Sequence, residues 1–133
     1  MEFVFETVIA GNHLDVFGHV NNANYLELYE EARWDFIEKN GFGLERIKRD
    51  KVGPVILDIN ITFKAELLNR DKVKIISHPG EMKNKLIMAL HQKIVKEDGT
   101  VASFLMMHIG FFDLEKRKLI PPTKDWFKAI GIA

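Results

Sequence analysis

Residues 2–9 alternate between two sets of side chains, one of which is Phe3, Phe5, Thr7 and Ile9. A period of two puts alternate side chains on opposite faces of an extended chain, so this segment predicts a first β-strand. The sequence Ala10-Gly11-Asn12 ends the alternation. Residues 11–24 are rich in glycine, asparagine and histidine and contain one aspartate, which predicts a polar loop.

A helical pattern follows the loop. Apolar residues recur three or four positions apart, at Tyr25, Leu28, Tyr29, Ala32 and Phe36. This stripe predicts an amphipathic helix, with charged residues such as Arg33 on its other faces. The helix is expected to end at Lys39-Asn40-Gly41, where a cation and then a glycine follow the last turn.

Three asparagines, at positions 21, 22 and 24, are candidates for the N-cap of this helix, because asparagine is among the preferred N-cap residues. Asn24 is followed three residues later by Glu27, a spacing that imitates a capping box. We therefore expect at least one of the three asparagines to cap the helix.

The second half of the chain predicts strands, after a linker over residues 44–54 that is rich in Lys, Arg and Asp. Residues 57–63 alternate apolar and polar side chains, which predicts a strand with one buried and one polar face. A second strand starts at Val73 and is expected to end at His78-Pro79-Gly80. Residues 86–95 predict a third.

Residues 101–112 are apolar on both faces, so this strand is expected to be central or to lie in a subunit contact. The segment 97–100, which contains Asp-Gly, predicts the hairpin turn before it. His108 within this strand is expected to be a core residue, and residues 117–133 to form a short helical or irregular cap. The order of strand, loop, one helix and four strands in hairpin succession indicates an α+β fold, in which the sheet curls around the helix.

Length and composition fit one domain over residues 1–133, with 19 basic and 19 acidic side chains and no net charge. A nucleic-acid or membrane surface would need a basic excess, which this chain lacks. The absence of cysteine excludes thiolate nucleophiles and disulfides. The five histidines show no metal-ligand spacing, so we expect no metal and no cofactor. Without a signal peptide or membrane span, a cytoplasmic location is expected.

The loop and the start of the helix read Asp15-Val16-Phe17-Gly18-His19-Val20-Asn21-Asn22-Ala23-Asn24-Tyr25-Leu26. This segment resembles the Asp-x-x-Gly-His-Val-Asn-Asn-x-x-Tyr signature of hotdog-fold acyl-CoA thioesterases, in particular those like 4-hydroxybenzoyl-CoA thioesterase. The order of elements along the chain also matches that family. The resemblance implies a curled antiparallel sheet of five or six strands wrapped around one long central helix. It also implies a homodimer or homotetramer.

Thioester hydrolysis needs a base or nucleophile and hydrogen-bond donors for the developing oxyanion. The resemblance places Asp15 in the first role and the backbone N–H near Asn22, at the helix N-terminus, in the second. His19 is a candidate for orienting Asp15 or water, and Glu31 on the helix is a reserve candidate for the acid. The place of His19 beside Gly18 could equally serve the turn, and Gly18 is a candidate for contact with the substrate.

Candidates for the substrate contacts are less specific. Tyr25 and Tyr29 are expected in the core or the pocket wall, and Lys83 and Lys85 are candidates for the phosphates of coenzyme A, as are Arg70 and Lys72. A set of apolar residues is available to line an acyl pocket: Phe17, Phe36, Phe63, Met88 and Met106.

Three functions remain open from the sequence. The leading one is an acyl-CoA thioesterase. The second is a thioesterase acting on acyl carrier protein, whose acidic surface would be met by a basic rim comprising Arg46, Lys48, Arg49 and Lys51. The third is a non-catalytic acyl-CoA-binding domain, against which the presence of Asp15 beside Gly18 argues.

Overall fold

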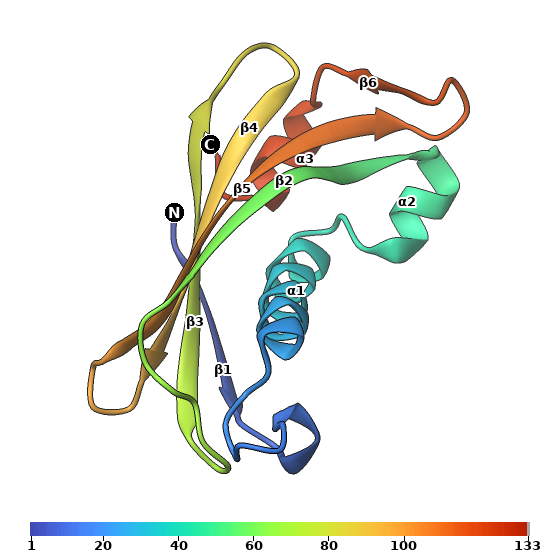
Figure 1. Ribbon diagram of the computed structural model, residues 1–133. Coiled ribbons are helices and arrows are strands. Elements are labelled where there is room, and N and C mark those ends of the chain that lie inside the picture. The colour runs from blue at the N-terminus through green and yellow to red at the C-terminus, as the bar shows by residue number, and fades with distance from the viewer. Residues whose placement is uncertain (133) are drawn as a thin grey trace.

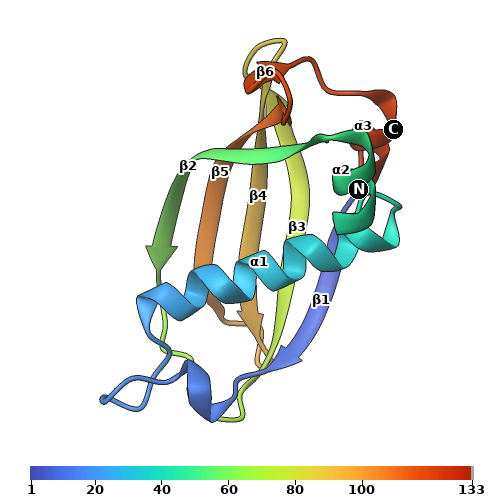
Figure 2. The same ribbon diagram turned by 90° about the vertical axis from the view of Figure 1, so that its right-hand side faces the viewer.

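The structure, a computed structural model, describes residues 1–132 (Figure 1). Its elements in chain order are β1 (Phe3–Val8), a 3₁₀ turn η1 (Gly11–His13), α1 (Asn22–Lys39), α2 (Leu44–Asp50), β2 (Val52–Phe63), β3 (Lys72–Met82), β4 (Ile87–Lys96), β5 (Val101–Asp113), β6 (Lys118–Ile120) and α3 (Lys124–Ala129). The strands form one sheet in the order β1-β3-β4-β5-β2, with β6 beside β5. All pairs are antiparallel. Figure 2 shows α1 lying across the concave face of this curled sheet, which confirms the predicted α+β architecture.

Helix α1 buries the predicted stripe against the sheet and in addition buries Arg33 and Ile37. The expectation that Arg33 lies on a solvent face was wrong. The helix begins at Asn22, and the side chain of Asn21 caps it by accepting a hydrogen bond of 2.8 Å from the Ala23 N–H. The capping box expected at Asn24 is also wrong, because the Asn24 amide instead donates to the His13 carbonyl at 2.8 Å.

Two boundaries differ from the sequence predictions. The expected linker over residues 44–54 is mostly helix α2, whose last turn is followed by Lys51 with a φ of 57°. Strand β3 continues past His78-Pro79-Gly80 to Met82, with an irregular register after Pro79. Proline is tolerated there because the ladder is already interrupted.

Strand β2 does not form a hairpin with β3, as the predicted succession implied. It pairs with β5 instead, and the chain then crosses to the other side of the sheet, where β3 lies between β1 and β4. The hairpins β3–β4 and β4–β5 are as predicted, and β5 is flanked on both sides, by β4 and β2. Strand β2 is consequently an edge of the sheet.

The apolar face of β2 is largely uncovered in the single chain, contrary to the prediction. Leu57, Ile59 and Phe63 retain 43%, 38% and 49% of their surface. Ile59 and Phe63 pair with Met107 and Ser103 of β5, which are buried, so this is the side of β2 that faces α1. Ile61 of the same face packs against the core, so the face is covered only in part.

The far end of the sheet is closed by α3, the predicted cap. Trp126 is buried and packs edge-on against Phe42, with ring centroids 5.4 Å apart, and stacks on Phe111 at 5.5 Å. The expectation that His108 is a core residue was wrong. It is partly exposed, and its Nδ1 lies 2.7 Å from an oxygen of Asp58. Within residues 1–132, no helix combines the length and the apolar character needed to cross a membrane.

Candidate active site

The polar loop predicted from the sequence folds back on itself between β1 and α1. Leu14 and Val20 form an isolated antiparallel bridge, and the Asp15 N–H donates to the His19 carbonyl at 3.0 Å. The Gly18 N–H returns to the Asp15 carbonyl at 3.1 Å. Gly18 adopts a φ of 80°, a left-handed conformation that glycine takes without strain. The turn therefore depends on Gly18 and holds Asp15 at its base.

Asp15 is half-buried, and the loop fixes its carboxylate. Its Oδ1 accepts a hydrogen bond of 2.8 Å from the Phe17 N–H, the geometry of an Asx turn. Among residues 1–132, no side chain or N–H donates to the second carboxylate oxygen. That oxygen is free to act on water or on a carbonyl carbon.

The loop is anchored to the segment that leads into β3. His19 bridges Leu68, and the Val20 N–H donates to the Leu67 carbonyl at 3.0 Å. The bond from Asn24 to His13 joins the beginning of the loop to the first turn of α1. Asp15 and the N-terminus of α1 thus lie at the same end of the fold. The loop between β1 and α1 is visible at the bottom of Figure 1.

A pocket of about 500 Å³ opens at this end. It is lined by the loop, the start of α1 and the segment after β2, through Asp15, Phe17, His19, Val20, Asn21, Asn22, Tyr25, Phe63, Lys64, Ala65 and Glu66. The structure thus brings together Asp15, His19, Asn22 and Tyr25 of the predicted site residues. Residues 64–66 were missed, because nothing in their own sequence indicates a site and only the β2–β5 pairing places them here.

The backbone N–H of Asn22 is a free donor at the point where α1 begins in this pocket. The neighbouring N–H groups all have acceptors. Asn21 donates to the His13 carbonyl, and Asn24 donates to the Asn21 carbonyl. The Ala23 N–H donates to the side chains of Asn21 and Asn22. The Asn22 N–H donates to no group within residues 1–132. Asn22 is the first residue of α1, where unpaired N–H groups and the positive end of the helix dipole favour negative charge.

His19 lines the pocket but does not contact the Asp15 carboxylate. Its ring stacks on that of Phe17, with centroids 5.9 Å apart and planes 14° from parallel. The described residues hold no group of three or more His, Asp or Glu side chains that could bind a metal ion.

The two predicted tyrosines have different environments. Tyr25 is buried at the wall of the pocket, where its hydroxyl donates to the Ala65 carbonyl at 3.2 Å and its ring meets Phe63 edge-on at 4.9 Å. Tyr29 is fully buried behind it and does not line the pocket. Burial raises the pKa of both hydroxyls, so neither tyrosine supplies an anion at neutral pH.

The remaining predicted residues lie elsewhere. Lys83 and Lys85 are in the turn between β3 and β4, at the opposite end of the sheet from Asp15 (Figures 1 and 2). Glu31 is exposed on α1 outside the pocket lining. Of the apolar candidates, Phe17 and Phe63 line the pocket, whereas Phe36 and Met88 are buried in the core and Met106 lines a hollow on the outer face of the sheet.

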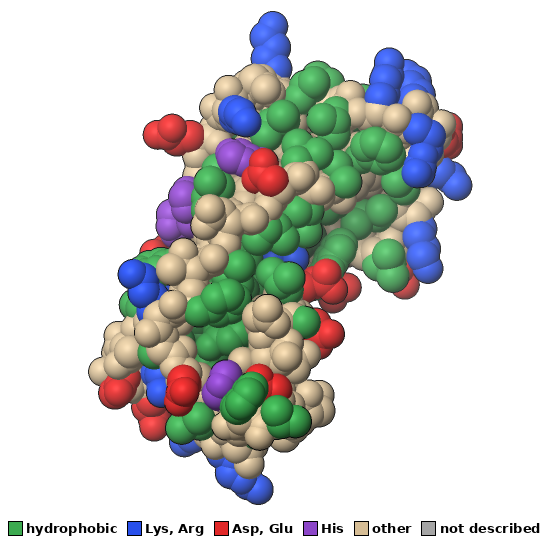
Figure 3. Space-filling view, viewed as in Figure 1, with side chains coloured by type: hydrophobic (Ala, Val, Ile, Leu, Met, Phe, Trp, Pro, Cys, Tyr) green, Lys and Arg blue, Asp and Glu red, His purple; other side chains and the backbone are tan. Residues whose placement is uncertain are grey.

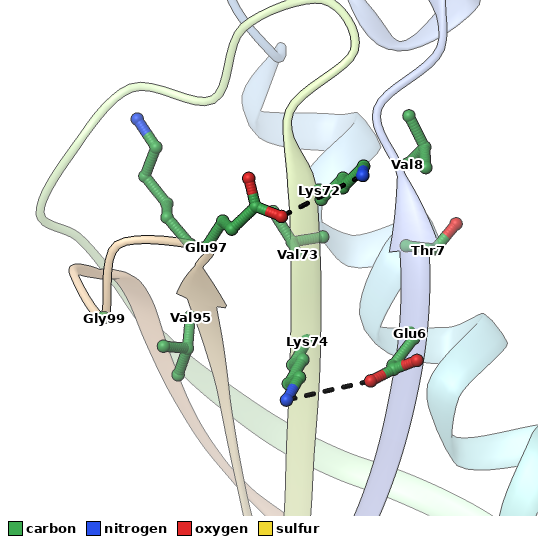
Figure 4. Close-up of a pocket in the computed structure, with 10 residues that line it drawn as sticks. Glu6, Thr7, Val8, Lys72, Val73, Lys74, Val95, Glu97 and Gly99 are labelled. Carbon is green, nitrogen blue, oxygen red and sulfur yellow. Dashed lines mark ion pairs between the residues drawn. The ribbon is translucent and has the colours of Figure 1, made fainter.

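A larger hollow of about 590 Å³ lies on the outer face of the sheet, near the β4–β5 turn (Figure 4). Its charged side chains neutralise each other, since Lys74 faces Glu6 at 3.7 Å and Lys72 faces Glu97 at 4.0 Å. It contains neither a free backbone donor at a helix start nor a carboxylate without a cation. The smaller pocket at Asp15 is the better candidate for chemistry.

Comparison with known proteins identifies the family of this chain. Residues 10–130 match the sequence profile of the family described as "Thioesterase-like superfamily". The long-chain acyl-CoA thioesterase FadM of Escherichia coli is 30% identical over 112 residues, which cover 84% of each chain.

Two solved structures are similar over nearly the whole chain. The probable thioesterase YbaW of Escherichia coli has a TM-score of 0.83 at 29% identity and covers 96% of this chain and 95% of its own. A Staphylococcus aureus protein in complex with CoA has a TM-score of 0.89 at 18% identity, with 98% of this chain and 82% of that one covered. At that identity the second likeness speaks for the fold alone.

Proposed function

The chain belongs to the thioesterase-like superfamily, and from that premise we propose that it hydrolyses acyl-CoA thioesters to coenzyme A and a carboxylic acid. One observation carries the assignment of residues. A fixed carboxylate, Asp15, and a free backbone donor, the Asn22 N–H, line the same pocket. These are the two groups that thioester hydrolysis requires.

In the proposed reaction, the thioester carbonyl oxygen accepts a hydrogen bond from the Asn22 N–H. Asp15 removes a proton from water while the water oxygen bonds to the carbonyl carbon. The resulting oxyanion is stabilised by the N–H and by the dipole of α1. The carbonyl then re-forms and the C–S bond breaks, and the thiolate of coenzyme A leaves with little need for a general acid. The proton held by Asp15 then passes to solvent, which restores the carboxylate. Direct attack by Asp15 is the alternative for the same carboxylate.

We propose that the acyl chain lies on the apolar side of the pocket. Phe63, the last residue of β2, lines the pocket and belongs to the uncovered apolar face of that strand. FadM is a long-chain acyl-CoA thioesterase, and a row of exposed apolar side chains next to the candidate site suits a chain of that kind. We therefore propose a long-chain acyl group for this protein.

The uncovered face of β2 also supports a homodimer. In Figure 3, hydrophobic side chains gather in a band across the side of the molecule that carries β2. An unpaired edge strand with an apolar face is suited to pairing with a second copy, because it offers both backbone hydrogen bonds and apolar surface. The predicted roles of Lys83 and Lys85 at the CoA phosphates require such a second copy, since within one chain they lie at the other end of the sheet.

A carrier-protein substrate is less favoured. Arg46 lies 2.6 Å from Asp125 and 3.1 Å from Asp50, and Arg49 lies 2.9 Å from Asp50. These contacts hold the pKa of Asp50 and Asp125 below the usual range, so both carboxyls stay charged. The predicted basic rim thus has much of its charge neutralised within α2 and its neighbour α3.

The test is thiol release from a panel of short, long and aromatic acyl-CoAs by the wild-type protein and by Asp15→Asn. We expect hydrolysis of at least one long-chain ester and a loss of about a hundredfold or more in Asp15→Asn. Asp98→Asn is a matched control, because Asp98 makes the same turn by accepting from the Thr100 N–H at 2.9 Å but lies outside the pocket. Equal rates for wild type and Asp15→Asn would refute the role of Asp15. Absence of turnover with every ester would refute the enzyme.

A further inference from the structure

Four polar side chains are buried in the layer between α1 and the sheet: Arg33, Ser77, Gln92 and Ser103. Hydrogen bonds join the first three, which expose 7%, 1% and 2% of their surface. The Arg33 guanidinium donates to Gln92 Oε1 at 3.0 Å. The Gln92 amide in turn donates to the Tyr29 carbonyl at 3.2 Å and to Ser77 Oγ at 3.0 Å. We call this group of three residues the α1 clamp.

The clamp is an unusual way to fill a core. Within residues 1–132 the guanidinium forms no ion pair, and burial lowers the pKa of Arg33. Arginine is rarely buried without a carboxylate, and buried polar groups can often be replaced by apolar ones without loss of stability. Net stabilisation is therefore a poor explanation for these three residues together.

The geometry of the clamp fixes the position of α1 on the sheet. Gln92 of β4 holds the helix at two points one turn apart, the carbonyl of Tyr29 and the side chain of Arg33. Ser77 of β3 holds Gln92 from the neighbouring strand. Rotation of the helix, or a slip by one turn of about 5.4 Å, would break both contacts and leave buried polar groups unpaired. The directional hydrogen bonds of the clamp therefore add to the apolar packing a requirement for one position of α1.

The position of α1 matters for the proposed chemistry because the two reactive groups come from different elements. Asp15 sits in a loop anchored on Leu67 and Leu68, ahead of β3. The Asn22 N–H belongs to α1, about 10 Å along the helix from Tyr29. A displacement of about 1 Å between reacting groups can lower a rate about a hundredfold.

We infer that Arg33 and Gln92 are positioning residues for thioester hydrolysis: by fixing α1 on β3 and β4, they hold the Asn22 N–H at the right place relative to Asp15. This inference rests on the proposed function. It assigns no contact with substrate to either residue.

The main test is the triple variant Arg33→Met/Gln92→Leu/Ser77→Ala, in which all three groups become apolar at similar size, so that the fold is kept. We expect kcat to fall about tenfold or more with KM changed less than about threefold. Gln92→Glu is a second variant. It keeps an acceptor for Arg33 but removes the amide that donates to the Tyr29 carbonyl, so kcat should also fall.

The matched control is Leu90→Ala, the preceding inward residue of β4, which is fully buried but makes no polar contact with α1. It should lower the melting temperature and leave kcat near the wild-type value. Wild-type kcat in the triple variant and in Gln92→Glu, or an equal loss of kcat in Leu90→Ala, would overturn the inference.

A measurement independent of catalysis separates this inference from the proposed function. The amide NMR shifts of Asn22 and Ala23 report the position of the first turn of α1. They should change in the triple variant and stay unchanged in Leu90→Ala. If the wild-type protein hydrolyses no thioester, the proposed function fails while these shifts still decide whether the clamp positions the helix. Unchanged shifts in the triple variant would refute the clamp itself.

Discussion

Proline at position 22 would remove the proposed oxyanion donor with little disturbance of the fold. Proline has no N–H, and the first helical position is where proline is best tolerated, because its N–H is unpaired there. Asn22 occupies that position, and its N–H donates to no protein group within residues 1–132. The preceding residue, Asn21, has a ψ of 148°, the extended conformation that a residue before proline adopts. The Asn21 cap on Ala23 stays in place.

We expect Asn22→Pro to fold and to lose a factor of about 10²–10³ in kcat, equivalent to about 2.7–4 kcal/mol of transition-state stabilisation from one oxyanion donor. Asn22→Ala is the matched control. It loses the side-chain contact to the Ala23 N–H but keeps its own N–H, so its rate should stay within a few-fold of wild type. Thiol release gives the rates, and circular dichroism with thermal melting shows whether both variants fold.

Two results would refute this reasoning. If Asn22→Pro retains more than about a tenth of the wild-type kcat, the Asn22 N–H is not the oxyanion donor. If Asn22→Ala loses as much activity as Asn22→Pro, the asparagine side chain carries the effect instead of the backbone.

Three further outcomes are expected. Ile59→Lys puts a charge on the uncovered apolar face of β2 and should shift the protein from dimer to monomer in size-exclusion chromatography with light scattering. The control Lys93→Glu, on the outer face of the sheet, should leave the dimer intact. A wild-type monomer would contradict the proposed assembly. Burial, and then His78, whose ring stacks on that of His91, lower the pKa of His91 below its unfolded value of 6.5, so the folded state binds its proton less readily than the unfolded state. The stability from neutral His91 is therefore present above about pH 6.5 and is lost as pH falls through the folded pKa. The melting temperature of the wild-type protein should drop between about pH 7.5 and 5, and His91→Gln should reduce that drop. An unchanged drop in His91→Gln would refute the role of His91. Gly18→Ala forces a side chain into a conformation with φ of 80°. The variant should lose about 1 kcal/mol of stability in urea unfolding and should have a lower kcat. Full activity would show that the loop does not depend on this glycine.

The sequence was sufficient for features that depend on neighbours along the chain. The helical stripe from Tyr25 to Phe36 and the turn at residues 97–100 are local patterns, and both predictions are confirmed. The motif around Asp15 also lies within one short segment, and the structure brings its members to one pocket. Their catalytic roles stay predictions until the variants are measured.

Features that depend on distant pairings were not predictable in the same way. The alternation in residues 57–63 is that of a half-buried strand, but which element covers its apolar face is decided by the order of strands in the sheet. Arg33 has a charge that usually points to solvent, and only its partner Gln92, 59 positions later in the chain, explains its burial. The lysines at 83 and 85 were chosen by charge, which carries no information on which end of the sheet they occupy.

The crossing of the chain from β2 to β3 has a consequence for the folding pathway. The hairpins β3–β4 and β4–β5 close over short loops, whereas β2 pairs with β5 across separations from 40 residues (Phe63 to Ser103) to 61 residues (Val52 to Asp113). Long-range pairing carries a higher loop-closure entropy and forms more slowly. Strands β3, β4 and β5 are therefore expected to form an early nucleus onto which β2 docks late. Residues 63–66, one wall of the pocket, would be ordered only at that step, so binding competence should emerge after most of the secondary structure has formed.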